Sequence, residues 1–188
     1  MATNNTIQPI VVQWNANGLG NRVKLGEFER LINLYSPICI CIQHAGKYNK
    51  DTKNYKIAKM STNNNGEYGT AIYVHNSVTY DDIQINTTDL QPSAICIHIP
   101  NKGKLHILNC YNQPKLNYNM NQLKDIINQV PEPKLVVGDF NSHSPTWDAN
   151  CESPDTGGKI VEKMLEDGKL TCINEEENLT FYSKIHCT

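Results

Sequence analysis

The pattern that most restricts the fold is an apolar run, an amphipathic segment and a second apolar run near the start of the chain. The two apolar runs, Ile10 to Trp14 and Ile38 to Ile42, have the length of buried strands. Between them, apolar residues recur at helical spacing, at Leu25, Phe28, Leu31, Ile32 and Tyr35. Pro37 ends this helix because proline cannot continue it. The order predicts a βαβ-like unit.

The rest of the chain alternates strands with helices. Strands are predicted over residues 68–74, 94–99, 105–111 and 135–138, and helices within residues 117–130 and 158–170. Residues 100–104, "PNKGK", indicate a hairpin turn, and residues 46–67 are expected to be loop with short strands. Because no internal repeat or linker interrupts this order, residues 1–188 are predicted to form a single α/β domain with a substantial antiparallel component.

Composition narrows the class of protein. The chain has 188 residues, 39% hydrophobic and 19% charged, which fits a globular domain. No run approaches the ~18 apolar residues of a membrane helix, and the start lacks the features of a signal peptide. The formal charge of −2 argues against a broad non-specific surface for nucleic acid. Seven irregularly spaced cysteines do not suggest a disulfide framework, so a reducing, intracellular setting is expected.

Polar residues follow several predicted strands at their C-terminal ends. If these strands share a layer, their side chains converge on one edge of the domain. Carboxylate, amide and hydroxyl groups suit a phosphate ester, because an acid moves a proton and the donors bind phosphate oxygens. Each of these residues taken alone is more simply explained as the start of a turn after its strand. The residues concerned are Asn15, Asn17, Gln43, His44, Tyr111, Asn112, Asp139, Asn141 and His143.

Six motifs in this order resemble the endonuclease/exonuclease/phosphatase superfamily. More narrowly, they are similar to the endonuclease domain of non-LTR (LINE-type, jockey-like) retrotransposon polyproteins. The most specific is "GDFNSHSPTW" at residues 138–147, and the resemblance covers nearly the whole chain. The others are "QWNANGL", "PICICIQ", "GTAIYVHNSV", "LHILNCYNQP" and "LTFYS".

This resemblance implies a four-layered α/β sandwich, with two mainly antiparallel sheets and outer helices. It also implies nicking of DNA with Mg²⁺ or Mn²⁺, to prime reverse transcription by another domain of the same polyprotein. Asn15 and Asn17 would lie at the metal and phosphate site, and Tyr111 would contact the scissile phosphate. Asp139 would handle the proton of the water or the leaving group, and Asn141 would orient Asp139.

Two departures from the family pattern suggest impaired catalysis. The family has Gln then Glu after the second strand, with Glu as a metal ligand, whereas this chain has Gln43 and His44. The family also continues to a strand with Ile-Asp-Leu and to a final Asp-His pair, whereas this chain stops at Thr188, so its C-terminal strands are expected to be missing. His186 follows "TFYS" too soon to take that role.

The remaining expectations concern the substrate and partners. Asn112, His143, Lys50 and Lys53 are predicted to bind substrate, the lysines because the segment from Lys47 to Lys59 interleaves Lys with Tyr; a solvated loop is the alternative. DNA is the expected partner, and no membrane interaction is expected. The domain is expected to be a monomer and to act in the nucleus. A decayed or domesticated fragment, at most a binding module, is one alternative function, and a phosphodiesterase or phosphatase of the same superfamily is another.

Overall fold

The computed structural model describes residues 7–62, 69–86, 90–99, 101–113 and 119–174. They form two four-stranded sheets and three α-helices. The N-terminal sheet has the order β1-β2-β4-β3, from β1 (Gln8–Asn15), β2 (Pro37–Gln43), β3 (Tyr55–Ser61) and β4 (Thr70–His75). The C-terminal sheet has the order β5-β6-β7-β8, from β5 (Thr79–Ile83), β6 (Ser93–Ile99), β7 (Gly103–Tyr111) and β8 (Lys134–Asp139).

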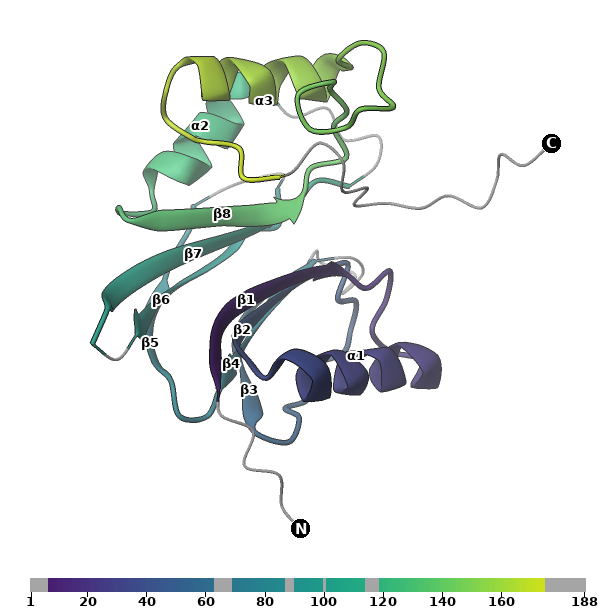
Figure 1. The fold of residues 1–188 in the computed structure, drawn as a ribbon, viewed down its shortest axis with the longest axis vertical. Coiled ribbons are helices and arrows are strands. Elements are labelled where there is room, and N and C mark those ends of the chain that lie inside the picture. The colour runs from purple at the N-terminus through teal and green to yellow at the C-terminus, as the bar shows by residue number, and fades with distance from the viewer. Residues whose placement is uncertain (1–6, 63–68, 87–89, 100, 114–118, 175–188) are drawn as a thin grey trace, which may run out of the picture.

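The two sheets pack face to face with helices on both outer faces, as Figure 1 shows. Helix α1 (Arg22–Tyr35) covers the N-terminal sheet, and α2 (Met120–Asn128) and α3 (Thr156–Glu166) cover the C-terminal sheet. Buried side chains of both sheets, including Cys41, Ile72, Ile95 and Ile107, fill the space between them. The predicted four-layered α/β sandwich is therefore confirmed. None of the described helices is long and apolar enough to cross a membrane.

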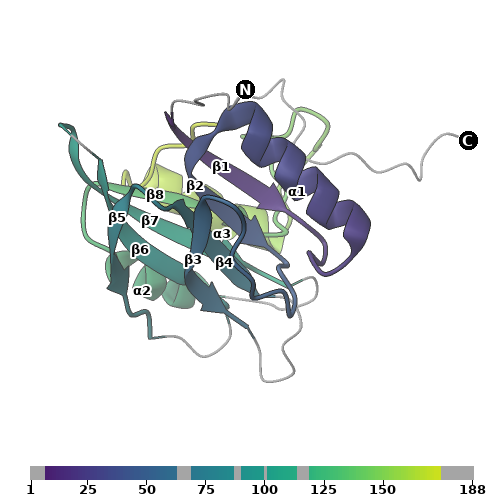
Figure 2. The ribbon, with the colours of Figure 1, turned by 90° about the horizontal axis from the view of Figure 1, so that it is seen from below.

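Most strand pairs are antiparallel, but each sheet contains one parallel pair. β1 runs parallel to β2 across the α1 connection, which confirms the predicted βαβ unit, and β7 runs parallel to β8. Parallel strands end at the same edge of a sheet. Asn15 therefore lies beside Gln43, and Tyr111 lies beside Asp139. Figure 2, turned by 90°, shows the two sheets stacked with their strands running across the molecule.

Local sequence signals explain where the helices begin and end. Asn21 caps α1 by accepting a hydrogen bond from Lys24 N, and Ser36 takes a left-handed conformation (φ 42°) directly before Pro37. Asn119 and Gln122 form a capping box at the start of α2. The predicted helices are therefore present, and among the strands that the structure describes, β5 was not predicted.

Candidate active site

The candidate site lies at the edge where β1, β2, β7 and β8 end, which we call the rim. Asn15 of the N-terminal sheet donates a hydrogen bond from Nδ2 to Asp139 Oδ2 of the C-terminal sheet (2.5 Å). Asn141 N donates to the other carboxylate oxygen, Asp139 Oδ1 (2.9 Å). Two donors on different oxygens hold the carboxylate in one orientation. Of the residues predicted from the sequence, Asn15, Asp139, Asn141 and Tyr111 are brought together here.

Three rim residues turn the chain sharply after their strands. Asn17, His44 and Asn141 have φ values of 49°, 50° and 46°, a left-handed conformation that asparagine adopts more readily than most residues. Asn17 N donates to Asn15 Oδ1 (3.1 Å), and Gly18 N donates to His44 O (2.8 Å). These bonds tie the turn after β1 to the turn after β2. Asn17 and His44 therefore lie on the N-terminal sheet's side of the rim.

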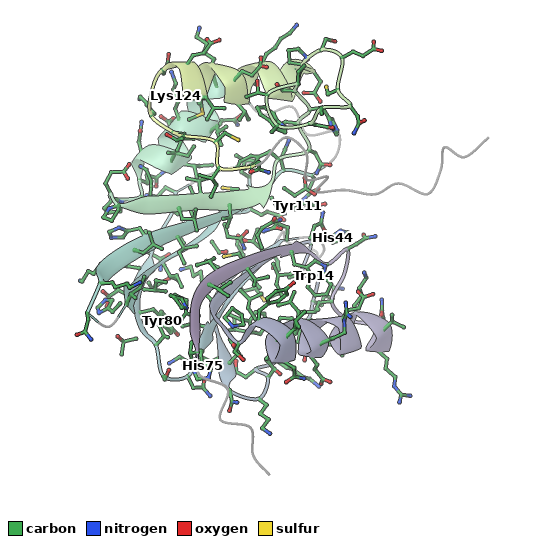
Figure 3. All side chains as sticks on the ribbon, in the orientation of Figure 1. Trp14, His44, His75, Tyr80, Tyr111 and Lys124 are labelled. Carbon is green, nitrogen blue, oxygen red and sulfur yellow. The ribbon has the colours of Figure 1, made fainter. Side chains whose placement is uncertain are left out.

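His44 and Tyr111 face each other across the two sheets. Their rings stack with centroids 5.8 Å apart and an angle of 24° between the planes. Figure 3 labels both residues, and they lie side by side where the sheets meet. Partial burial lowers the pKa of His44, because a charged imidazolium loses hydration there. This shift favours the neutral ring at neutral pH, and Tyr111, only 3% exposed, packs against the ring from the opposite sheet.

A chain of amides, buried at Gln43 and Asn109 and exposed at Gln13, links the two sheets behind the rim, and sequence reasoning missed it. Gln43 Nε2 donates to Asn109 Oδ1 (2.6 Å), and Gln13 Nε2 donates to Gln43 Oε1 (2.5 Å). Asn109 Nδ2 in turn donates to the carbonyls of Ile42 and Ala71. Gln43 and Asn109 are fully buried. The available signal was an asparagine inside an otherwise apolar strand, because such a residue needs partners for its amide.

The loop after β8 is fixed to α3. Ser144, fully buried, donates to Glu162 Oε1 (2.5 Å) and accepts from Thr146 N (2.9 Å). Trp147 Nε1 donates to Ser142 O (3.2 Å). His143 contributes its carbonyl, which accepts from Asp155 N (3.0 Å), while its side chain is exposed. The serine, histidine and tryptophan of "GDFNSHSPTW" thus hold the loop in place. A substrate contact by His143 stays a prediction.

Gly138 allows β8 to approach β7 closely just before Asp139. A Cβ atom at this position would lie 2.2 Å from Cys110 O and 2.9 Å from Cys110 C. Any side chain would therefore push the two parallel strands apart. The glycine of the "GDFN" motif is thus required to bring Asp139 alongside Tyr111.

Asn112 is turned inward. Its side chain is 3% exposed, and Nδ2 donates to Phe140 O (3.0 Å). Its carbonyl accepts from Asn141 Nδ2 (2.6 Å), and its backbone N donates to Asp139 O (2.9 Å). One amide hydrogen of Asn112 is thus used within the protein, whereas its buried Oδ1 accepts no hydrogen bond from the described residues. These contacts position the turn that carries Asp139 and Asn141, and a substrate contact by Asn112 stays a prediction.

The two lysines predicted to bind substrate do not lie at the rim. Asn54, next to Lys53, accepts from Asn76 N (2.8 Å) beyond the His75 end of β4, whereas the other end of β4 pairs with Gln43. Lys50 lies nearer the middle, where its carbonyl accepts from the Tyr73 hydroxyl (3.3 Å). Figure 3 shows His75 and His44 at opposite ends of this sheet. The segment therefore leads away from the rim along the sheet, and substrate contacts by Lys50 and Lys53 stay predictions.

The donor atoms at the rim fit Mg²⁺ poorly. Mg²⁺ prefers a near-octahedral set of oxygen ligands. Asp139 supplies the one carboxylate among the predicted rim residues that the structure describes, and both its oxygens already accept hydrogen bonds. His44 offers a nitrogen, which suits Mn²⁺ or Zn²⁺ better than Mg²⁺. Asn15, Asn17 and His44 lie in turns that are tied together by hydrogen bonds, but their neutral side chains add no second negative charge.

Comparisons with known proteins show what the sequence and the fold of this chain resemble. Residues 105–188 match the family model described as endonuclease-reverse transcriptase. Among solved structures, the chain is similar to the endonuclease domain of TRAS1, a telomere-specific non-LTR retrotransposon. That match has a TM-score of 0.72 and 18% sequence identity, and it covers 88% of this chain and 74% of the other. The search of curated proteins found no match. The resemblance inferred from the motifs is confirmed.

Proposed function

We propose that this chain is the DNA endonuclease domain of a non-LTR retroelement, and that the histidine at position 44 impairs its cleavage. The contact between Asn15 and Asp139 carries the proposal, because it joins the two sheets at the rim. The amide of Asn15 holds the Asp139 carboxylate in one orientation, and it comes from the other sheet. The carboxylate therefore lies beside hydrogen-bond donors of the N-terminal sheet. That arrangement suits a phosphodiester, which needs proton transfer and hydrogen-bond donors in one place.

Each rim residue has a distinct part in this proposal. Asp139 keeps lone pairs beyond those that accept from Asn15 and Asn141, so it takes up the proton of the attacking water or returns one to the leaving oxygen. Asn15 and Asn141 orient the carboxylate. The Tyr111 hydroxyl donates to a non-bridging phosphate oxygen. Because Tyr111 is only 3% exposed, only its edge reaches the phosphate.

His44 is the reason to expect slow cleavage. A divalent ion held by Asp139, Asn15 and His44 would neutralise the charge of the phosphate and of the attacking oxygen. The neutral imidazole gives such an ion one nitrogen and no negative charge. The loss of one electrostatic contribution costs ~10²–10³ in rate in well-studied enzymes. Mn²⁺ therefore supports more nicking than Mg²⁺. The nick primes reverse transcription by a further domain of the same polyprotein, and the domain itself acts as a monomer in the nucleus.

A supercoiled-plasmid nicking assay tests the site. The variants are Asp139→Asn, which keeps the shape but not the charge, and Asp125→Asn on the exposed face of α2 as a charge-matched control. We expect slow, Mn²⁺-stimulated nicking that Asp139→Asn abolishes and Asp125→Asn leaves unchanged. Nicking that survives Asp139→Asn would show that the rim is not the catalytic site. Equally fast nicking in Mg²⁺ and Mn²⁺ would contradict the role given to His44.

Binding measurements separate an impaired enzyme from a binding module. His44→Glu restores an anionic oxygen ligand, so it should tighten Mn²⁺ binding, measured from the electron paramagnetic resonance signal of free Mn²⁺. Tyr111→Phe should weaken the binding of a fluorescent DNA duplex, measured by anisotropy at fixed salt. DNA binding that depends on Tyr111, with no nicking in either metal, would favour the decayed or domesticated module instead.

A further inference from the structure

A second cluster of metal-ligating side chains lies on the outer face of the C-terminal sheet. Asp81 of β5 pairs with Cys96 of β6, and directly opposed residues of antiparallel strands point to the same face. His98 lies two residues beyond Cys96 on the same strand, so its side chain also points to that face. The carboxylate oxygen, the sulfur and the imidazole nitrogen all lie within 4.8 Å of one another. We propose that Asp81, Cys96 and His98 form a binding site for Zn²⁺.

The spacing of the three side chains suits one ion. Ligand atoms held at about 2.0–2.3 Å from a tetrahedral Zn²⁺ lie roughly 3.3–3.8 Å apart. Asp81 Oδ2 and His98 Nε2 are already 2.7 Å apart, so they have to separate slightly, while the sulfur has to approach by up to about 1.5 Å. Side-chain rotation supplies such movements without a change in the strands. The geometry therefore needs no rearrangement of the sheet.

The chemistry of the donors selects the metal. One sulfur, one nitrogen and one carboxylate oxygen form a borderline-soft set that Zn²⁺ accepts and Mg²⁺ does not prefer. Water completes the fourth position, on the side of Asp81, which is exposed. Cys96 is only 4% exposed, so its sulfur lies at the inner end of the site. Zn²⁺ has to displace the proton of the Cys96 thiol on binding, and burial opposes that loss because it raises the pKa of the thiol.

Two existing contacts compete with the ion. His98 Nε2 pairs with Asp81 Oδ2, and Lys104 Nζ lies 3.7 Å from the same oxygen. The positive charge of Lys104 repels an incoming Zn²⁺ ion and so weakens its binding. An ordinary cross-strand ion pair is therefore the simpler reading for Asp81 and His98 alone. An ion pair does not require a third ligand, however, whereas the buried sulfur of Cys96 lies beside both side chains.

This cluster is separate from the rim. His98 pairs with Lys104 near the β6–β7 hairpin, whereas Tyr111 lies at the other end of β7. His106, opposite Cys96, is five residues from Tyr111 along β7, which corresponds to about 17 Å of strand. The bound ion would join the edge strand β5 to β6. The site therefore acts on the stability of the C-terminal sheet and does not take part in phosphodiester chemistry.

Substitution with Co²⁺ tests the site in the whole chain, because a thiolate ligand gives a charge-transfer band in the near ultraviolet. The background variant carries Cys151→Ser, Cys172→Ser and Cys187→Ser, which removes other thiols that could bind Co²⁺. We expect the band to titrate to one ion per chain, to disappear in Cys96→Ser, and to be displaced by Zn²⁺. Absence of the band in the background variant, or its persistence in Cys96→Ser, would overturn the proposal.

Variants of the two other proposed ligands and of nearby residues measure how much each side chain contributes to the affinity for Zn²⁺. Asp81→Asn and His98→Gln should each weaken Zn²⁺ binding about tenfold or more in calorimetry, with the fold checked by circular dichroism. His75→Gln, a strand histidine of the other sheet, should leave the affinity unchanged. Lys104→Gln should tighten binding because it removes the opposing charge. Weaker binding in Lys104→Gln, or equal losses in His98→Gln and His75→Gln, would contradict the assigned ligands.

Discussion

Replacing Asn109 by leucine should destabilise the protein by removing the hydrogen bonds that link the two sheets. The side chain makes three of them, to Gln43, Ile42 and Ala71, and it is fully buried. At about 1 kcal/mol of net stability for each bond, Asn109→Leu should cost about 3 kcal/mol. For a domain of this size, 1 kcal/mol lowers the melting temperature by about 2–4 °C, so we expect a decrease of about 6–12 °C. Thermal unfolding followed by circular dichroism measures it.

A matched control and a double variant make this prediction specific. Asn128→Leu, at an exposed position at the end of α2, should change stability by no more than about 0.5 kcal/mol. The double variant Gln43→Leu/Asn109→Leu should cost less than the sum of the single changes, because the hydrogen bond between Gln43 and Asn109 is counted in both single changes but lost only once. A melting temperature unchanged in Asn109→Leu, or strictly additive costs, would refute the view that these amides act as a pair across the sheets.

Three further predictions follow from contacts near the site and elsewhere. Gly138→Ala should destabilise the fold by about 1–3 kcal/mol in thermal unfolding, because its Cβ would meet Cys110 O at 2.2 Å. Ser144→Ala should cost about 2 kcal/mol, because its two hydrogen bonds, one of them to Glu162, are lost. Partial burial lowers the pKa of His75, so the unfolded chain binds the proton more tightly and stability falls as the pH decreases below 6.5. His75→Gln should therefore lose less stability on acidification, as measured by urea unfolding at several pH values.

The sequence predicted the βαβ unit, the β6–β7 hairpin and the strand ends because each depends on a local pattern. Strand β5 was missed because its sequence does not alternate clearly between apolar and polar residues. Tyr80 packs between the sheets, where Lys56 lies 5.0 Å from its ring centroid, and Asp82 on the same face pairs with Lys59 of the other sheet (2.7 Å). Asp81 lies on the outer face. Each face of this edge strand thus carries a charged residue, which hides the alternation that marks a strand.

The candidate site was predicted in part. The residues that follow strands converge as expected, because parallel strands place their ends together. The path of the Lys47–Lys59 segment was not predictable, because composition does not tell in which direction a loop crosses a sheet. The role of Asn112 also depended on tertiary contacts. Its amide lies next to the predicted site in sequence, but only the fold shows that it donates to Phe140 O.

The contact between Asn15 and Asp139 has a consequence for how this domain tolerates change. Among the described residues, the strands of the N-terminal sheet precede Asn76 and those of the C-terminal sheet follow it, so two successive halves of the sequence each hold part of one site. Neither half can evolve its share of the rim alone, since a small slide of one sheet over the other moves the carboxylate away from its amide. Substitutions deep in the layer between the halves are therefore expected to act on the chemistry from a distance. A library of such substitutions, scored for nicking and for folding separately, would map which interior positions keep the two halves in register.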